Sequence, residues 1–186
     1  MPTPSRTSFD EIVAAGRILI EASGPEGLNM QEVARMVGVR APSLYKHVAG
    51  RDMLIRRVAE QVVGDLASVL EGAVTGSDPS RDLIALANEF RRFAHANPGA
   101  YRLLFRPMPA EWRPDSLLLT AAAAPVVRTA SALVGTEHSL EAARTVTAWA
   151  HGFVSMELSG AFRMGGDVEA AFGFGLETLS RALTER

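Results

Sequence analysis

Apolar residues recur along most of this 186-residue chain at intervals of three and four positions, which is the spacing of an amphipathic helix. Alternating runs of β-branched residues, which would indicate strands, are absent. The first helix begins at Ser8-Phe9-Asp10-Glu11, which has the form of a capping box, and stops before Gly24-Pro25. The pattern therefore predicts an all-α protein.

Two short helices and a long one are expected next. The first short helix starts at a second capping-box pattern, Asn29-Met30-Gln31-Glu32, and ends at Gly38. The second opens around Pro42, a residue that the first turn of a helix tolerates, and ends at Gly50. The long helix runs from Arg51 to about Val74 and is expected to link two domains. Five further helices, which bring the total to about nine, are predicted at Pro79–Ala96, Gly99–Phe105, Asp115–Val134, Leu140–Phe162 and Val168–Leu183.

Composition removes several classes of chemistry. The chain has no cysteine, which excludes disulfides, thiolate metal sites and cysteine nucleophiles. Its four histidines are scattered and no catalytic constellation is present, so we expect no enzyme activity, no metal and no cofactor. The polar start from Met1 to Ser8 and the lack of an uninterrupted apolar run of about 18 residues predict a soluble cytoplasmic protein without membrane contact.

One segment is strongly basic although the whole chain has a net charge of −2. Between Arg35 and Arg57 there are six basic residues and only one acidic residue, Asp52. A short basic segment on an acidic body is typical of a local contact with a polyanion. The alternative is a solvated helix face.

The two short helices beside this basic segment have the spacing of a helix-turn-helix. Ala34 allows the helices to cross closely, Gly38 can take a left-handed turn, and Leu44 fills the gap between the helices. Arg and Lys side chains in the second helix can pair with guanine edges, and Ser, Tyr and His can bond to bases or phosphates. These residues predict DNA binding.

The stretch from Asn29 to Leu54, above all its Leu44-Tyr45-Lys46-His47 run, closely resembles the N-terminal signature of TetR-family transcriptional regulators. The resemblance covers residues from about 8 to 58 and implies a three-helix DNA-binding domain, set here at residues 1–50, whose third helix enters the major groove. Arg40 departs from the family's usual Ser or Thr, so no operator sequence can be borrowed. The residues that contact DNA by this resemblance are Asn29, Tyr45, His47 and Arg51 at phosphates, Arg40, Ala41, Pro42, Ser43 and Lys46 at bases, and Met30 beside Asn29.

A narrower resemblance lies in the C-terminal half. The segment Ala148-Trp149-Ala150-His151-Gly152 resembles the Trp-His-Gly segment of one group of TetR-family effector domains, and Phe172-Gly173-Phe174-Gly175 suits the final helix of such a domain. It implies that residues 51–186 form an effector-binding and dimerisation domain. The homodimer would be a four-helix bundle made by Leu140–Phe162 and Val168–Leu183 of each chain.

Aromatic and methionine residues of the C-terminal half are candidates for a pocket, although ordinary cores use the same residue types. His151 can orient an effector or be a hydrogen-bonded core or interface residue. The adjacent pair Arg91-Arg92 can hold an anionic effector or form one exposed face. The candidate ligand-binding residues are Phe90, Phe93, Phe105, Trp112, Trp149, His151 and Met156.

The leading hypothesis is a bacterial repressor that binds double-stranded DNA at a palindromic operator and is released from it by a small hydrophobic effector. Release on ligand binding is what the resemblance favours over promoted binding. A helical enzyme or small-molecule-binding protein with an incidental helix-turn-helix is the alternative, and a purely structural dimerisation module is a third. Salt-dependent binding to specific DNA separates the first hypothesis from the others.

Overall fold

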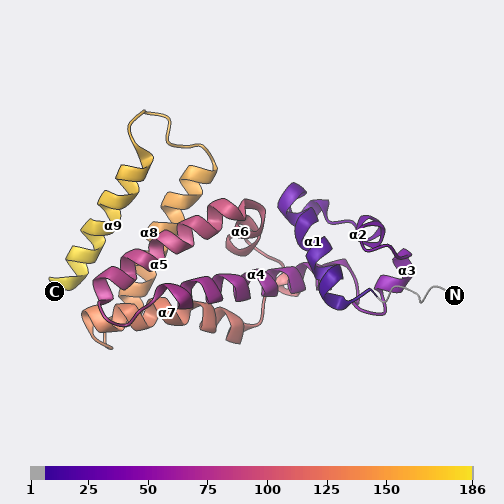
Figure 1. Cartoon of the computed structure of the whole chain (residues 1–186), viewed down its shortest axis with the longest axis horizontal. Coiled ribbons are helices and arrows are strands. Elements are labelled where there is room, and N and C mark those ends of the chain that lie inside the picture. The colour runs from indigo at the N-terminus through magenta and orange to yellow at the C-terminus, as the bar shows by residue number, and fades with distance from the viewer. Residues whose placement is uncertain (1–6, 186) are drawn as a thin grey trace. The chain divides into compact units, whose positions relative to one another are not determined.

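The computed structural model of the chain describes residues 7–185. Residues 1–6, which belong to the polar N-terminal stretch interpreted above, lie outside the described residues. The described part contains nine α-helices, two short 3₁₀ turns and no strand, so the predicted all-α class is confirmed (Figure 1). The elements are α1 (Phe9–Ser23), η1 (Pro25–Gly27), α2 (Met30–Met36), α3 (Ala41–Leu44), α4 (Arg51–Ala73), α5 (Pro79–Ala96), α6 (Pro98–Phe105), η2 (Ala110–Trp112), α7 (Ser116–Val134), α8 (Ser139–Leu158) and α9 (Val168–Thr184).

α1 begins and ends as its sequence predicts. The Ser8 hydroxyl accepts a hydrogen bond from the Glu11 backbone N–H at 3.1 Å, and the Glu11 carboxylate accepts one from the Ser8 N–H at 2.8 Å. The helix stops at Gly24, whose φ of +69° lies in the left-handed region that favours glycine. Its apolar stripe is buried, with Ile12 and Ile20 completely inaccessible to solvent.

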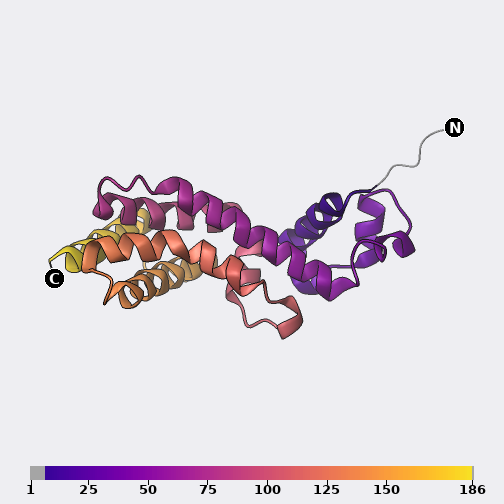
Figure 2. The ribbon, with the colours of Figure 1, turned by 90° about the horizontal axis from the view of Figure 1, so that it is seen from below.

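The chain divides into two compact units. Unit 1 consists of residues 1–64 and 97–118, and unit 2 consists of residues 65–96 and 119–186. α4 is one unbroken helix across the boundary between residues 64 and 65 (Figure 2). α6 and the proline-rich segment after it therefore belong to unit 1, although they follow α5 of unit 2 in sequence. The functional boundary expected at residue 50 stays a prediction.

In unit 1, α6 packs against the C-terminal end of α1. The Glu21 carboxylate accepts hydrogen bonds from the N–H groups of Gly99 at 2.7 Å and Ala100 at 2.9 Å. These first-turn N–H groups have no partner within their own helix, so Glu21 caps α6 from outside it. Arg17 donates to the side-chain oxygen of Asn97 at 3.1 Å. Sequence reasoning did not predict this contact between α1 and α6.

In unit 2, α5 packs against both α8 and α9, which also contact each other. Ala87, Phe172 and Leu176 form a buried cluster, and the rings of Trp149 and Phe153 pack against it. This cluster places aromatic side chains from α8 and α9 on the inner face of α5.

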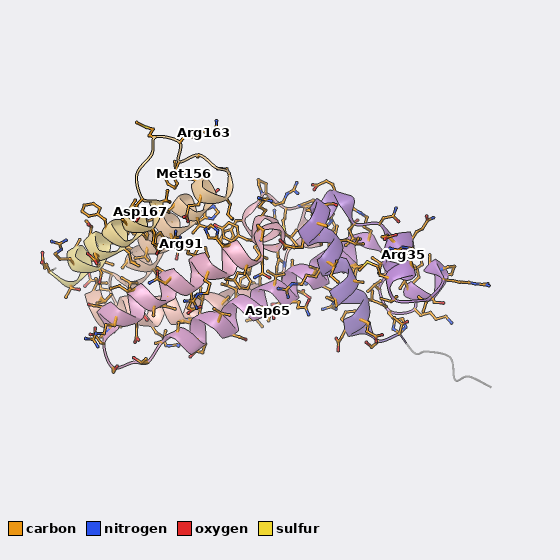
Figure 3. All side chains as sticks on the ribbon, turned by 45° about the horizontal axis from the view of Figure 1, so that its top comes forward. Arg35, Asp65, Arg91, Met156, Arg163 and Asp167 are labelled. Carbon is orange, nitrogen blue, oxygen red and sulfur yellow. The ribbon has the colours of Figure 1, made fainter. Side chains whose placement is uncertain are left out.

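α8 is shorter than the sequence pattern predicts, because it ends at Leu158 rather than at Phe162. Gly160 takes a φ of +65°, which ends the helix, and its N–H returns to the carbonyl of Glu157 at 2.9 Å. The connection then leads to Asp167, whose carboxylate caps the first turn of α9 (Figure 3).

α7 is apolar and largely exposed. Its most apolar 18-residue window has a mean hydropathy of 1.7 with 17% of the window buried, so the helix is long and apolar enough to cross a membrane by length and composition alone. Within unit 2 its Arg128 donates to the Glu71 carboxylate at 2.7 Å. The helix is continuous through Pro125, which is buried.

Candidate nucleic-acid interface

The start of α2 is fixed by the cap that its sequence predicts. The Asn29 side-chain oxygen accepts a hydrogen bond from the Gln31 N–H at 2.8 Å. Glu32, which the capping-box pattern directs back toward Asn29, instead accepts hydrogen bonds from the guanidinium of Arg35. Arg35 is exposed on the outside of α2, and this ion pair offsets its charge (Figure 3).

The turn between α2 and α3 is made by Gly38. Its φ is +71°, a conformation that L side chains rarely adopt, and the next N–H, that of Val39, reaches the Ala34 carbonyl at 2.9 Å. Leu44 is completely buried and Ala34 is 3% exposed. The helix-turn-helix spacing of small residue, glycine and leucine is therefore confirmed.

α3 is a single short helix. Arg40 occupies its N-cap position with an extended backbone, and Pro42 lies in its first turn. The chain continues after Leu44 in tight turns, in which the His47 N–H donates to the Leu44 carbonyl at 2.8 Å. The segment after α3 is therefore held against the last residue of the helix.

Most residues predicted to contact DNA are accessible to solvent. Met30 is the exception, since it is buried in unit 1. Asn29, Arg40, Pro42, Tyr45, Lys46 and His47 are exposed, and Ala41, Ser43 and Arg51 are half-buried. Their contacts with DNA stay predictions.

The cationic side chains of the basic segment differ in whether they are paired with carboxylates. Arg56 and Arg57 both bind the carboxylate of Glu60, at 2.9 and 2.8 Å. Arg40 and Lys46 have no carboxylate partner among residues 7–185. Arg40 and Lys46, on either side of α3, are therefore two cations of the segment without a carboxylate partner, whereas Arg56 and Arg57 share one carboxylate.

Arg51 lies against the backbone of its own unit. Its Nε donates to the Leu28 carbonyl at 2.9 Å and its Nη2 to the Pro25 carbonyl at 2.5 Å. The ring centroid of Trp112 is 5.6 Å from the guanidinium carbon, and the indole N–H donates to the Asp52 carboxylate at 2.8 Å. The sequence predicted that Arg51 contacts a DNA phosphate and that Trp112 lines the effector pocket. It did not indicate that these two side chains contact each other.

The residues predicted to line an effector pocket divide between the two units. Phe105 and Trp112 belong to unit 1, where the Phe105 ring lies 4.8 Å from that of Tyr101. Phe90 and Phe93 belong to unit 2 and are buried on α5. The structure therefore does not gather all seven candidates within one compact unit.

The remaining candidates are on α8. Trp149 stacks on Phe172 with ring centroids 5.0 Å apart, and it lies so close to Gly175 that a Cβ there would be 2.5 Å from Trp149 Cζ2. His151 is half-buried, and this burial lowers the pKa of its imidazole. Met156, at the end of the helix, is 46% exposed.

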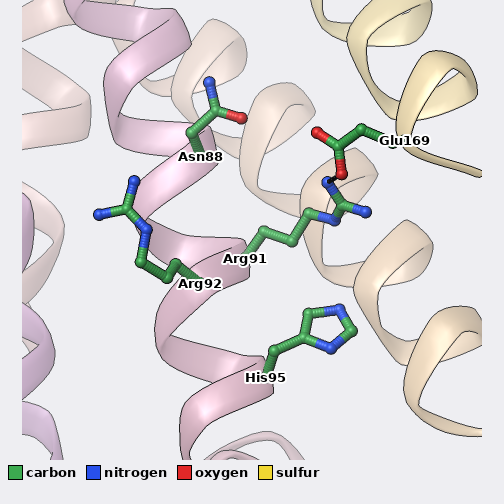
Figure 4. Close-up of a pocket in the computed structure, with 5 residues that line it drawn as sticks. All are labelled: Asn88, Arg91, Arg92, His95 and Glu169. Carbon is green, nitrogen blue, oxygen red and sulfur yellow. Dashed lines mark hydrogen bonds and ion pairs between the residues drawn. The ribbon is translucent and has the colours of Figure 1, made fainter.

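A hollow of about 440 Å³ opens on unit 2 and is polar (Figure 4). Arg91 donates to Glu157 at 2.9 and 2.7 Å and also to Glu169, while His95 Nε2 is 3.2 Å from Glu157. Burial raises the pKa of Glu157, but the hydrogen bonds and charges of Arg91 and His95 together bring it below its ordinary value. The lining residues are Asn88, Arg91, Arg92, His95 and Glu169. None is among the seven candidate ligand-binding residues, although the Arg91-Arg92 pair was considered as a site for an anionic effector.

The helices predicted to form the dimer interface present apolar side chains to solvent in the single chain. Leu140, Met156 and Phe174 are 51%, 46% and 73% exposed. Gly152 and Gly173 have open space where a side chain would begin. A second copy of these faces would cover this surface, and the interface stays a prediction. No group of three or more His, Cys, Asp or Glu side chains that could hold a metal ion occurs within residues 7–185.

Comparison with known proteins gives a consistent result. A family model described as tetracyclin repressor-like, C-terminal domain, matches residues 83–179. An uncharacterised HTH-type transcriptional regulator of Mycobacterium tuberculosis, Rv0681, is 28% identical over 159 residues, which are 84% of this chain and 73% of that protein. The crystal structure of the regulatory protein SCO4313 matches with a TM-score of 0.79 at 26% identity over 96% of this chain and 98% of its own. A TetR variant from Acinetobacter baumannii in complex with minocycline shares the fold, with a TM-score of 0.67 at 21% identity over 94% of each chain.

Proposed function

The chain belongs to the tetracyclin repressor-like family of transcriptional regulators, and we propose that it is a repressor that leaves its operator when a small hydrophobic effector binds. The observation that carries the proposal is the placement of Arg40 and Lys46. Both are exposed, Arg40 at the N-cap of α3 and Lys46 two residues after its last residue, and neither has a carboxylate partner within residues 7–185. An uncompensated cation on a helix that enters the major groove can pair with guanine O6 and N7.

We assign base reading to Arg40, Ala41, Pro42, Ser43 and Lys46, whose α3 is anchored by the buried Leu44. Contacts with phosphates are assigned to Asn29, Tyr45 and His47. All three are exposed; Asn29 precedes α3 in the sequence, and Tyr45 and His47 follow it. Arg51 can add to the positive field at the phosphates while its donors remain on backbone carbonyls.

The operator is proposed to be palindromic because the regulator acts as a homodimer. One helix-turn-helix reads a few base pairs, and two half-sites lie about 34–36 Å apart in operators read by such dimers. The α8 and α9 faces that carry Leu140, Met156 and Phe174 are the proposed interface, since they leave large apolar side chains exposed in the single chain.

The effector site is proposed within unit 2, among Phe90, Phe93, Trp149, His151 and Met156. The minocycline bound to the A. baumannii TetR variant supports a small-molecule site in a protein of this fold. Because α4 is continuous through both units, a ligand that prefers a displaced α4 would change operator affinity. A decisive shift takes a differential affinity of about 5 kcal/mol. The regulator is proposed to act in the cytoplasm.

The test is a charge-matched pair of variants. A duplex is first selected from a random-sequence library by the parent protein, and its affinity is then measured for Arg40→Ala and Arg35→Ala. Arg40→Ala should lose about 1–3 kcal/mol of binding free energy and change the preferred bases, because it removes a base contact. Arg35→Ala removes the same charge from an arginine already paired with Glu32 and should stay within a few-fold of the parent. Equal losses for both variants would refute the assignment of base reading to α3.

A further inference from the structure

The segment that follows α6 docks onto the first residues of α4 within unit 1. Arg106 binds the carboxylate of Glu26, the middle residue of the 3₁₀ turn η1, at 2.7 Å. Six residues further on, the indole N–H of Trp112 donates to the Asp52 carboxylate at 2.8 Å. The two attachments bring residues 106–112 onto η1 and α4, although Trp112 and Asp52 are separated by 60 positions in the sequence.

The Trp112 ring also supports the guanidinium of Arg51. The guanidinium carbon is 5.6 Å from the ring centroid, within the range of a cation–π contact. Asp52 Oδ1 lies 3.6 Å from Arg51 Nη1. The indole therefore contacts Arg51 with its face and holds the carboxylate beside Arg51 with its N–H.

Arg51 in turn fixes the chain just before the helix-turn-helix. It donates to the carbonyls of Pro25 at 2.5 Å and Leu28 at 2.9 Å. Leu28 directly precedes Asn29, the N-cap of α2. Hydrogen bonds from a charged donor are about twice as strong as neutral ones, so Arg51 is a firm tether for the start of α2.

We propose that Trp112 is a positioning residue for DNA binding, which acts through Arg51 and Asp52 to hold the turn before α2 and thereby the recognition helix packed on α2. The inference rests on the proposed function and adds to it a residue outside the helix-turn-helix. Loss of the indole N–H frees the Asp52 carboxylate, whose side chain is 60% exposed, to draw Arg51 away from the two carbonyls.

The test compares Trp112→Ala, which removes ring and N–H, with Trp112→Phe, which keeps a ring and removes only the N–H. Ala110→Ser is the control, because Ala110 is exposed in the same 3₁₀ turn. In the whole chain without DNA, amide hydrogen exchange of the peptide 24–31 should become about tenfold faster in Trp112→Ala and change less in Trp112→Phe. Exchange in α8 should stay at the parent rate in both variants. In Ala110→Ser the peptide 24–31 should also exchange at the parent rate. Unchanged exchange at 24–31 in both tryptophan variants overturns the tether.

The second measurement is affinity for the duplex that the parent selects from a random-sequence library. Trp112→Ala should bind about tenfold more weakly, and the loss should vanish when it is introduced into Arg51→Ala, since Trp112 acts through Arg51. If the fold losses in affinity of the two single variants multiply in the double variant, Trp112 acts independently of Arg51 and the proposal is overturned. If the parent selects no duplex, the proposed function fails, and the exchange result alone decides whether Trp112 holds the turn.

Discussion

A methyl group added at Gly99 tests the contact between α1 and α6 directly. Gly99 is the second residue of α6, and its Cβ would lie 2.6 Å from Glu21 Cα and 2.8 Å from the carbonyl oxygens of Glu21 and Ile20. These are backbone atoms in the last turns of α1, so no side-chain rotation can relieve the overlap. Gly99→Ala must push α6 away from α1.

The size of the effect follows from the two ways in which the protein can respond. If the helices yield slightly, overpacking costs about 1–3 kcal/mol. If α6 withdraws, the Glu21 carboxylate loses its bonds to the Gly99 and Ala100 N–H groups, and each bond to a charged acceptor is worth about 1.5–3 kcal/mol. The cheaper response prevails, so we expect unit 1 to lose about 2 kcal/mol of its free energy of unfolding.

The two tryptophans make the assay specific to one unit. Trp112 lies in unit 1 and Trp149 in unit 2, so urea unfolding followed by emission in a Trp149→Phe background reports unit 1. Gly64→Ala is the control, because Gly64 lies in the unit 1 part of α4 with nothing within 4 Å of an added Cβ, and it should be neutral or stabilising by up to about 1 kcal/mol. A Gly99→Ala protein as stable as its parent would refute the close approach of α1 and α6.

Three further outcomes are expected in unit 2. Glu157→Gln should lower the free energy of unfolding at pH 7 by about 2 kcal/mol, because it removes the main counter-charge of the half-buried Arg91 and leaves only the amide oxygen as an acceptor. Since the folded pKa of Glu157 is depressed, its contribution is present above its unfolded pKa and is lost as pH falls through the folded value. The free energy of unfolding of the variant should therefore fall less steeply on acidification than that of the parent. Gly175→Ala should disturb Trp149 emission and near-UV circular dichroism through the 2.5 Å overlap, and unchanged spectra would contradict that packing. Gly173→Leu, by contrast, meets open space in the single chain, so light scattering should show more monomer if α9 forms the dimer interface; a full dimer would place the interface elsewhere.

The helix-turn-helix was predictable because its signals are local. The Asn29 cap, the left-handed Gly38 and the buried Leu44 act within a span of sixteen positions, and each leaves a residue-type signature that can be interpreted without knowledge of the rest of the fold. The early end of α8 also had a signal, the glycine at 160. Gly160 lies inside the predicted range Leu140–Phe162, but its positive φ ends the helix.

The contacts that link distant segments were not predictable. Tryptophan is a residue type common in ligand pockets, and only the fold shows that Arg51 and Asp52 lie beside Trp112. The Arg91-Arg92 pair was interpreted as an anionic-effector site or one exposed face, but Arg91 is 14% exposed while Arg92 is 70% exposed, so the pair does not form one exposed face. The partners of Arg91 lie 66 and 78 positions away in the sequence, beyond the reach of periodicity arguments.

The discontinuous chain path of unit 1 has a consequence for biosynthesis. Arg17 and Asn97 are hydrogen-bonded across 80 positions, and unit 1 takes its last residues from 97–118. A ribosome adds about 5–20 residues per second, so α1 is made several seconds before the helix whose first turn its Glu21 caps. During that interval the nascent chain carries a helix-turn-helix without α6 and without the Trp112 support. The DNA-binding unit is therefore completed only after residue 118 has been translated.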